Sequence, residues 1–256
     1  MNEGRTLGSN ARATAGSSGR SAEAPDALTA KLSASSPTLC VSLVRNDLEL
    51  AMAVEDAGAD AIKLHINLDH PYARVRLGSF EEEAESLAAI VSTLKIPVGL
   101  VPRGAGGTTV EEIETYAEVG FDFVDLYSSF MSASLLAVPG IRKWAAPRVD
   151  YTPPMLEELS NLSGVDVIEA AFLPVQEFGS PLNVDDLVRL RVALNAIGGR
   201  KPLVLPTDRQ LTEPDLPILL SCGVTNFLIG YAVTGNDLQG VVEATKRFRR
   251  PLLNAS

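Results

Sequence analysis

Cysteine is scarce in this chain of 256 residues, which contains only Cys40 and Cys222. The two lie far apart and neither belongs to a Cys-x-x-Cys pair, so a disulfide framework or a zinc site is not expected. Free thiols are typical of a reducing compartment, and we therefore expect a cytoplasmic protein. Long apolar runs are also missing, since none reaches the length of a membrane-spanning helix.

Basic residues are outnumbered by acidic ones. There are 22 Lys and Arg against 32 Asp and Glu, which leaves a formal net charge of −10. This balance argues against nucleic acid or an anionic membrane surface as the main partner. It does not exclude a small anionic metabolite, because a few backbone N–H groups and one or two cations are enough to hold one.

The N-terminal stretch, residues 1–36, has almost no large apolar side chains and is rich in Ser, Ala, Gly and Arg. It lacks the apolar segment of a secretory signal. We predict a disordered tail, or a start codon assigned too early, followed by one domain over residues 37–250. The alternative is a transit peptide, which Arg5, Arg12 and Arg20 among few acidic residues would suit.

A repeat dominates the rest of the chain. Each copy begins with Gly after a helix and continues as an apolar strand pattern: Gly58–Asn67, Gly120–Tyr127, Gly164–Ala171 and, more weakly, Gly223–Gly230. Side chains alternate between the two faces of a strand, so Lys63, His65 and Asn67 share one face of the first copy. In register, Lys63 aligns with Asp125, Glu169 and Leu228, and His65 aligns with Tyr127, Ala171 and Gly230.

Between residues 38 and 248 the apolar pattern alternates strand and helix eight times. Such alternation predicts a parallel sheet with right-handed crossovers, and eight units close as a (β/α)8 TIM barrel. The runner-up is an open, doubly wound sheet. The repeat at alternate strands favours the barrel, whose interior is filled in layers from alternate strands. We also expect a polar loop over residues 68–80 and a short helix over residues 130–138.

The barrel predicts where the aligned side chains lie. One interior layer should hold Lys63, Asp125, Glu169 and Leu228, and the layer nearer the carboxyl ends of the strands should hold His65, Tyr127, Ala171 and Gly230. In the opposite register the three charges would be desolvated between sheet and helices without an obvious partner, at a cost of several kcal/mol. Pointing inward, they can meet one another and a ligand.

Lys63 is the sharpest catalytic candidate. An interior Lys can stabilise a substrate oxyanion, transfer a proton, or form a Schiff base with a carbonyl. Asp125 and Glu169 are a pair of carboxylates suited to proton transfer. The structural alternative is an ion pair in which one carboxylate only holds Lys63 in place.

The two histidines, His65 and His70, lie at the end of the second strand. His65 should point into the barrel mouth, where it can shuttle protons near neutral pH, and its alternative is a satisfied structural histidine. A metal site built from His65, His70 and Asp69 lacks a recognised ligand spacing. We therefore expect no cofactor, with a divalent metal or a flavin left open.

The end of the last strand carries the one specific motif. Gly230-Tyr231-Ala232, followed by Thr234-Gly235-Asn236 before the last helix, resembles the closing Gly-x-Ala segment of the phosphate-binding (β/α)8 barrels. That superfamily contains aldolases, isomerases, epimerases and synthases. The resemblance implies a phosphate held by backbone donors at Gly230 and Gly235.

The resemblance has a departure at the preceding strand. Those relatives usually place a Gly-Gly pair after strand 7, where this chain has Thr207-Asp208-Arg209. Asp208 would repel a phosphate unless Arg209 offsets its charge. The Gly-rich loop Arg103–Thr109 offers a second anion cradle, and its alternative role is a flexible lid.

Together these features predict a lyase or isomerase that acts on a small anionic, phosphorylated carbonyl metabolite. Lys63 would stabilise an enolate or form an imine, Glu169 or Asp125 would move the proton, and His65 would assist. The expected binding residues are Asn67, Arg103, Tyr127, Thr207, Arg209, Gly230 and Gly235. The rivals are a non-catalytic barrel that binds a phosphoester and signals to a partner, and a metal-dependent hydrolase or aldolase. A homo-oligomer is left open.

Overall fold

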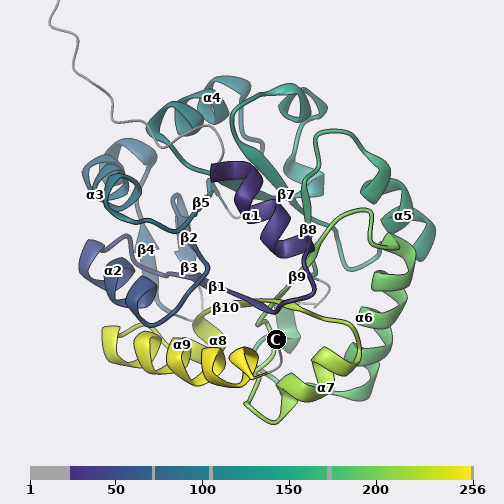
Figure 1. The fold of residues 1–256 in the computed structure, drawn as a ribbon. Coiled ribbons are helices and arrows are strands. Elements are labelled where there is room, and N and C mark those ends of the chain that lie inside the picture. The colour runs from purple at the N-terminus through teal and green to yellow at the C-terminus, as the bar shows by residue number, and fades with distance from the viewer. Residues whose placement is uncertain (1–23, 71–72, 104–105, 172–174, 255–256) are drawn as a thin grey trace, which may run out of the picture.

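The computed structural model describes residues 24–70, 73–103, 106–171 and 175–254. Within these residues, eight parallel strands close into a barrel in the order β1-β10-β9-β8-β7-β6-β5-β2 (Figure 1). They are β1 (Thr38–Ser42), β2 (Ala61–His65), β5 (Val98–Val101), β6 (Phe123–Tyr127), β7 (Arg142–Ala146), β8 (Val167–Glu169), β9 (Leu203–Pro206) and β10 (Asn226–Ile229). The predicted (β/α)8 barrel is confirmed, and the open doubly wound sheet is excluded.

Helices surround the barrel and connect its strands (Figure 1). They are α2 (Leu48–Asp56), α3 (Phe80–Thr93), α4 (Val110–Val119), α5 (Pro153–Asn161), α6 (Val184–Ile197), α7 (Asp215–Ser221), α8 (Tyr231–Thr234) and α9 (Leu238–Leu253). Capping boxes begin α3, α4 and α6, and their N-cap residues are Ser79, Thr109 and Asn183. Nowhere in the described part of the chain does a helix combine the length and apolar character needed to cross a membrane.

Short 3-10 turns occur in two connections, and between β6 and β7 they stand in place of a full helix. Between β6 and β7 they are η1 (Ser128–Phe130) and η2 (Ala133–Ala137), where a single short helix was expected. A third, η3 (Val175–Glu177), lies between β8 and α6. Buried Lys143 of β7 donates to the Val138 carbonyl at the end of η2, which anchors that connection to the barrel.

The sequence repeat builds the amino ends of alternate strands. The Gly of all four copies has a positive φ, between 88° and 103°, a conformation that favours glycine after a helix end. Two residues later, Asp60, Asp122 and Asp166 each accept a hydrogen bond of 2.7–2.9 Å from a backbone N–H of the preceding barrel strand. The repeat is therefore a joint between a helix end and a strand pair, and it sets the same register in each copy.

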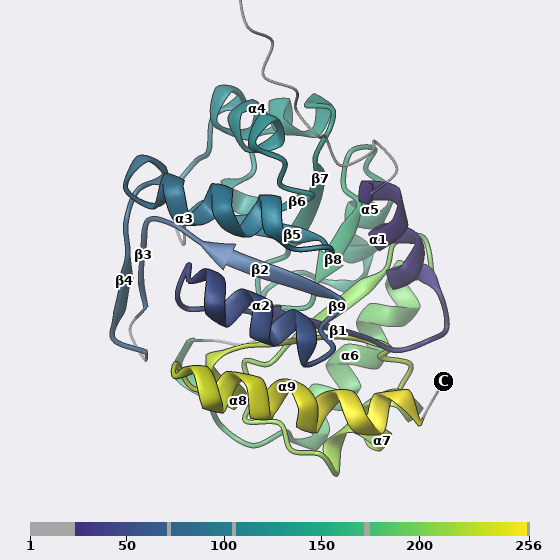
Figure 2. The same ribbon diagram turned by 60° about the vertical axis from the view of Figure 1, so that its left-hand side comes forward.

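An antiparallel hairpin follows β2, in the region where a polar loop was expected. Its strands are β3 (Leu68–His70) and β4 (Val75–Leu77). Asn67, with a φ of 50°, donates its backbone N–H to the Gly78 carbonyl at 2.7 Å and closes the base of the hairpin. Figure 2 shows the hairpin at the end of the barrel toward which β2 points, with α1 (Ala24–Ser33) at the other end.

Helix α1 corrects the expected tail over residues 24–33. Leu28 and Leu32, one turn apart, are 4% and 2% exposed because they pack into the barrel interior. The Asn226 side chain donates to the Leu32 carbonyl at 2.9 Å. The helix thus covers the amino end of the barrel (Figure 1). Two buried leucines are a weak signal in a Ser- and Ala-rich stretch, and residues 1–23 of the expected tail lie outside the described part.

An apolar layer continues from α1 into the barrel. Its members are Leu28, Leu32, Cys40, Ala61, Phe123, Trp144, Val167, Val204 and Leu228. The rings of Phe123 and Trp144 stack with centroids 4.1 Å apart. Gly99 makes room for this stack, since a Cβ at that position would lie 2.1 Å from the Phe123 ring. Leu228, expected in the layer of Lys63, belongs to this apolar group.

We predict that Gly99→Ala destabilises the barrel, because the new methyl group overlaps the Phe123 ring. The free energy of unfolding should fall by about 1–3 kcal/mol, the usual cost of overpacking a core. Denaturant unfolding measures this, with Gly107→Ala as the matched control, since a Cβ there meets nothing within 4 Å. Phe123→Leu added to Gly99→Ala should restore part of the loss, and equal stability of the two glycine variants would contradict the prediction.

Candidate active site

Three charged side chains meet inside the barrel, one each from β2, β6 and β8. Lys63 Nζ lies 2.7 Å from Asp125 Oδ2 and 2.6 Å from Glu169 Oε2. The three residues are 5%, 3% and 7% exposed, respectively. The residues on either side of Lys63 pack with the surrounding helices, so Lys63 itself points inward. The predicted convergence in the lumen is confirmed, and the catalytic roles stay predictions.

Burial and mutual repulsion set the protonation of this group. Burial lowers the pKa of Lys63, but Asp125 and Glu169 outweigh it and raise the pKa above the usual value of lysine. Burial raises the pKa of Asp125, but Lys63 outweighs it and lowers that pKa. The pKa of Glu169 is raised well above its usual range, first by burial and then by the charge of Asp125. The group therefore favours an ammonium, one carboxylate and one protonated carboxyl.

Polar side chains also occupy the carboxyl ends of the strands. His65 Nε2 lies 2.8 Å from Ser42 Oγ at the end of β1. The Asn46 side chain donates to the His65 carbonyl at 2.8 Å, which holds the loop after β1 against the end of β2. Tyr127 ends β6 and is 42% exposed. The pKa of its hydroxyl is raised, first by burial and then by the charge of Glu169. Tyr127 therefore interacts electrostatically with the Lys63–Asp125–Glu169 group.

Asp208 is a candidate that the sequence analysis considered only as an obstacle to phosphate. It follows β9, and its backbone carbonyl accepts from the Gly179 N–H at 2.7 Å. Burial raises its pKa, against the opposing charges of Lys63 and Arg209. Its carboxyl therefore interacts electrostatically with Lys63. The available signal was an acidic residue directly after a barrel strand, a position that carries catalytic groups in this fold.

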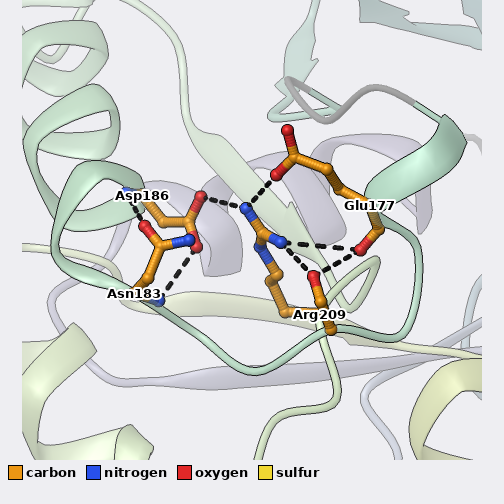
Figure 3. A network of polar contacts seen from close by, with 5 residues as sticks. Glu177, Asn183, Asp186 and Arg209 are labelled. Atoms are coloured by element: carbon orange, nitrogen blue, oxygen red, sulfur yellow. Dashed lines mark hydrogen bonds and ion pairs between the residues drawn. The ribbon is translucent and has the colours of Figure 1, made fainter.

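Arg209 is held by acidic partners from the 3-10 turn η3 and the first turn of α6 (Figure 3). Its Nη2 donates to Glu177 Oε2 at 2.6 Å and to Asp186 Oδ1 at 2.8 Å, and its Nη1 donates to the Ser180 hydroxyl. The side chain is only 7% exposed. Arg209 therefore ties the connection after β8 to the loop after β9, and its predicted contact with a substrate anion stays a prediction.

Arg103 and Asn67 line a different cavity from the charged group. Arg103 pairs with Glu112 of α4, and the Asn67 side chain donates to the Pro102 carbonyl at 3.1 Å. Both line a cavity of about 210 Å³ between the first turns of α3 and α4. The lining does not include Lys63 or its two carboxylate partners. Their predicted contact with a shared substrate stays a prediction.

The backbone donors expected at the last strand are already used. The Gly230 N–H donates to Thr207 Oγ1 at 2.9 Å, and the Gly235 N–H donates to the Tyr231 carbonyl at 3.0 Å. Gly235 ends the single turn of α8. Both amides therefore have acceptors within the fold, and their predicted contact with a phosphate stays a prediction. Thr207 accepts only the Gly230 N–H, and this bond joins the end of β9 to the end of β10.

A metal site would require several His, Cys, Asp or Glu side chains close together. Among the described residues, no group of three or more His, Cys, Asp and Glu side chains is placed to hold a metal ion. Cys40 lies beside the charged group on β1, and burial raises the pKa of its thiol to about 12. It is therefore a packing residue at neutral pH and not a thiolate ligand or nucleophile.

No family model and no curated protein matches this chain. Solved structures do. The tryptophan synthase subunit alpha of Legionella pneumophila is 15% identical with a TM-score of 0.61, over 90% of this chain and 98% of its own. Thiamine phosphate pyrophosphorylase of Pyrococcus furiosus is 18% identical with a TM-score of 0.59, over 87% and 98%. Phosphoribosyl anthranilate isomerase of Thermus thermophilus is 14% identical with a TM-score of 0.57, over 86% and 100%.

At these identities the likeness is one of fold. It confirms, at the level of the fold, the predicted resemblance to the barrels of the aldolase, isomerase and synthase type. The class is therefore a (β/α)8 barrel with a buried Lys–Asp–Glu group in its lumen. No particular family within that class is singled out.

We predict that Glu169→Gln flattens the dependence of stability on pH. Above pH 4.5, the ordinary value, the unfolded chain releases the Glu169 proton while the folded barrel keeps it. Wild-type stability therefore falls as the pH rises from 4.5 toward the raised pKa, and a glutamine cannot contribute to this loss. Urea unfolding across this range measures it, with exposed Glu158→Gln as control. Identical slopes for wild type and Glu169→Gln would contradict the raised pKa.

We predict that Arg209→Ala lowers the free energy of unfolding by about 3 kcal/mol, because it leaves Asp186 buried without its cation. Arg148→Ala is the control, since it breaks a pair in which both side chains are about 60% exposed, and it should change stability little. Adding Asp186→Asn to Arg209→Ala should recover part of the loss. Arg209→Ala as stable as Arg148→Ala would show that the network is not structural.

Proposed function

We propose that this chain is an enzyme of lyase or isomerase type that moves a proton next to the carbonyl group of a small metabolite. The observation that carries the proposal is the buried contact of one ammonium with two carboxyl groups of opposite pKa shift. Pairs of acids whose surroundings separate their pKa values are typical of acid–base sites. The structural neighbours, which are enzymes by name, support the same class.

Each member of the group has a role in this proposal. Lys63, kept as an ammonium, donates a hydrogen bond to the substrate carbonyl oxygen and stabilises the enolate that forms there. Glu169 carries the proton between the substrate carbon and the enzyme, since burial and the charge of Asp125 raise its carboxyl pKa, and a raised pKa suits a carboxyl group that transfers protons. Asp125 stays ionised and keeps Lys63 charged and in place.

The same geometry bears on the imine alternative. An imine needs a neutral amine, whereas the pKa of Lys63 is raised above that of an ordinary lysine. Because Glu169 already holds a proton in the favoured state, the Lys63 proton would first have to pass to Asp125, whose Oδ2 lies 2.7 Å away. The enolate route requires no such transfer from Lys63, and we therefore favour it.

An anionic group on the substrate needs a cation other than Arg103 or Arg209, which are paired with carboxylates. We propose Arg45, in the loop between β1 and α2 at the carboxyl end of the barrel. Its Nε is buried, and no hydrogen-bond partner for it is present among the described residues. The neighbouring Asn46 holds this loop against the end of β2, the strand that carries Lys63.

The test is exchange of solvent deuterium into carbonyl compounds, followed by proton NMR, because it needs no knowledge of the product. The panel includes matched pairs such as dihydroxyacetone and its phosphate. For a compound that exchanges, Glu169→Gln and Lys63→Met should each lower the rate by about 10²–10⁴-fold, the usual contribution of a proton-transfer group. Arg45→Met should lower the exchange rate of only the phosphorylated compound in each pair.

Lys95→Met, on an exposed position, is the control and should exchange at the wild-type rate. Binding of a phosphorylated compound without exchange, unchanged in Lys63→Met, would favour the non-catalytic regulatory barrel instead. Borohydride reduction in the presence of an active compound, followed by mass spectrometry, separates the two chemical routes. A reduced adduct on Lys63 would replace the enolate route with the imine route.

A further inference from the structure

The outer face of α6 is apolar. Val184, Val188 and Val192 are 73%, 55% and 40% exposed. They are spaced four residues apart, so they form one stripe along the solvent side of the helix. The opposite side of α6 already packs into the core through Leu190, Ala193 and Ile197. The helix is therefore apolar on two sides, which a helix with a single buried face does not require.

The neighbouring helix adds further exposed apolar side chains. Met155 of α5 and Leu162, the residue after its end, are 45% and 46% exposed. Figure 1 shows α5 and α6 side by side on the rim of the barrel, and the Arg200 side chain beyond α6 donates to Ser160 of α5 at 2.8 Å. Other exposed large apolar side chains, such as Met52 and Ile218, lie on separate helices. Several exposed apolar side chains on two adjacent helices are typical of a protein–protein interface, whereas isolated ones are ordinary.

Charges beside the stripe indicate which partner fits it. Exposed Asp185 and Arg189 lie one turn apart on the same side of the valines. Suppose that two copies of α6 pack antiparallel about a two-fold axis at Val188. Asp185 then lies three residues from the axis, and the partner's Arg189 lies one residue from the axis in the same direction. The two are then separated by about 3 Å along the helix. Each aspartate meets an arginine, and each copy supplies the same surface, as a two-fold interface requires.

We propose that this chain forms a two-fold homodimer through α6, with α5 at the edge of the interface. The pairing buries Val188 against its own copy and Val184 against Val192 of the second copy. Asp186, on the other side of α6, keeps its contact with Arg209, so the dimer braces the loops after β8 and β9 without competing for their bonds. The inference is independent of the proposed reaction, because no residue of the stripe contacts the charged group.

The first test is the mass of the full chain in solution, by analytical ultracentrifugation over a range of concentrations. The wild type should be a dimer. Val188→Asp places two like charges at the two-fold axis and should raise the dissociation constant by about a hundred-fold or more. Ile218→Asp is the control, because Ile218 is 46% exposed on another helix, α7. This variant should have the same dissociation constant as the wild type. Circular dichroism confirms that both variants are folded.

The second test fixes the partner and the direction of pairing. Asp185→Arg alone places arginines opposite arginines, and Arg189→Asp alone places aspartates opposite aspartates, so each variant should dimerise more weakly than the wild type. Mixed in equal amounts, the two single variants should form a heterodimer with both contacts of opposite charge. Because neither variant carries an Asp185–Arg189 pair within its own helix, recovery on mixing reports the contact between copies.

Each outcome decides the proposal. A wild-type chain that stays monomeric at its highest soluble concentration overturns it. So does a dimer that survives Val188→Asp as well as it survives Ile218→Asp, because the interface then lies elsewhere. A mixture of the charge variants that remains as weakly associated as its components overturns the antiparallel pairing.

Discussion

The structure depends on one contact, in which a buried ammonium lies between two buried carboxyl groups. Each of these groups would be costly to bury as an unpaired charge. Lys63 reaches Asp125 and Glu169 because each of the three follows the glycine of its repeat copy by the same number of residues, on β2, β6 and β8. The Phe123–Trp144 stack and helix α1 exclude water from the amino end. Because one cation faces two acids, Glu169 is left to carry a proton. This imbalance of charge is the basis of the acid–base chemistry that we propose.

The cations expected to bind a substrate anion show how little a residue type says about its use. Arg209 and Arg103 each lie where a phosphate group was expected, yet both are neutralised by acidic side chains of neighbouring helices and loops. The amides of Gly230 and Gly235 are likewise satisfied within the fold. In this barrel those groups hold loops and strand ends together.

The repeat has two meanings that only the structure separates. Its Gly and Asp positions are structural. The glycine, with its positive φ, follows the end of a helix, and the aspartate accepts a hydrogen bond from a backbone N–H of the preceding barrel strand. Its later positions, Lys63, Asp125 and Glu169, are free of that duty and face the lumen. The sequence showed both sets as one pattern. A search for function in such a repeat must therefore ask which positions the backbone already occupies.

The alternation of eight barrel strands with helices, the barrel that it implies and the inward side of the repeat could be predicted from the sequence, since periodicity and turn chemistry are local properties. The β3–β4 hairpin and the 3-10 turns between β6 and β7 could not. Helix α1 was not predicted, because its stability depends on two leucines that pack into the open end of a barrel formed by other segments. The partners of Arg103 and Arg209 and the raised pKa values of Asp208 and Glu169 were decided by tertiary structure. Each depends on which distant charges come within a few ångströms, and Coulomb energies at that range are set by separation and burial, which no sequence spacing records.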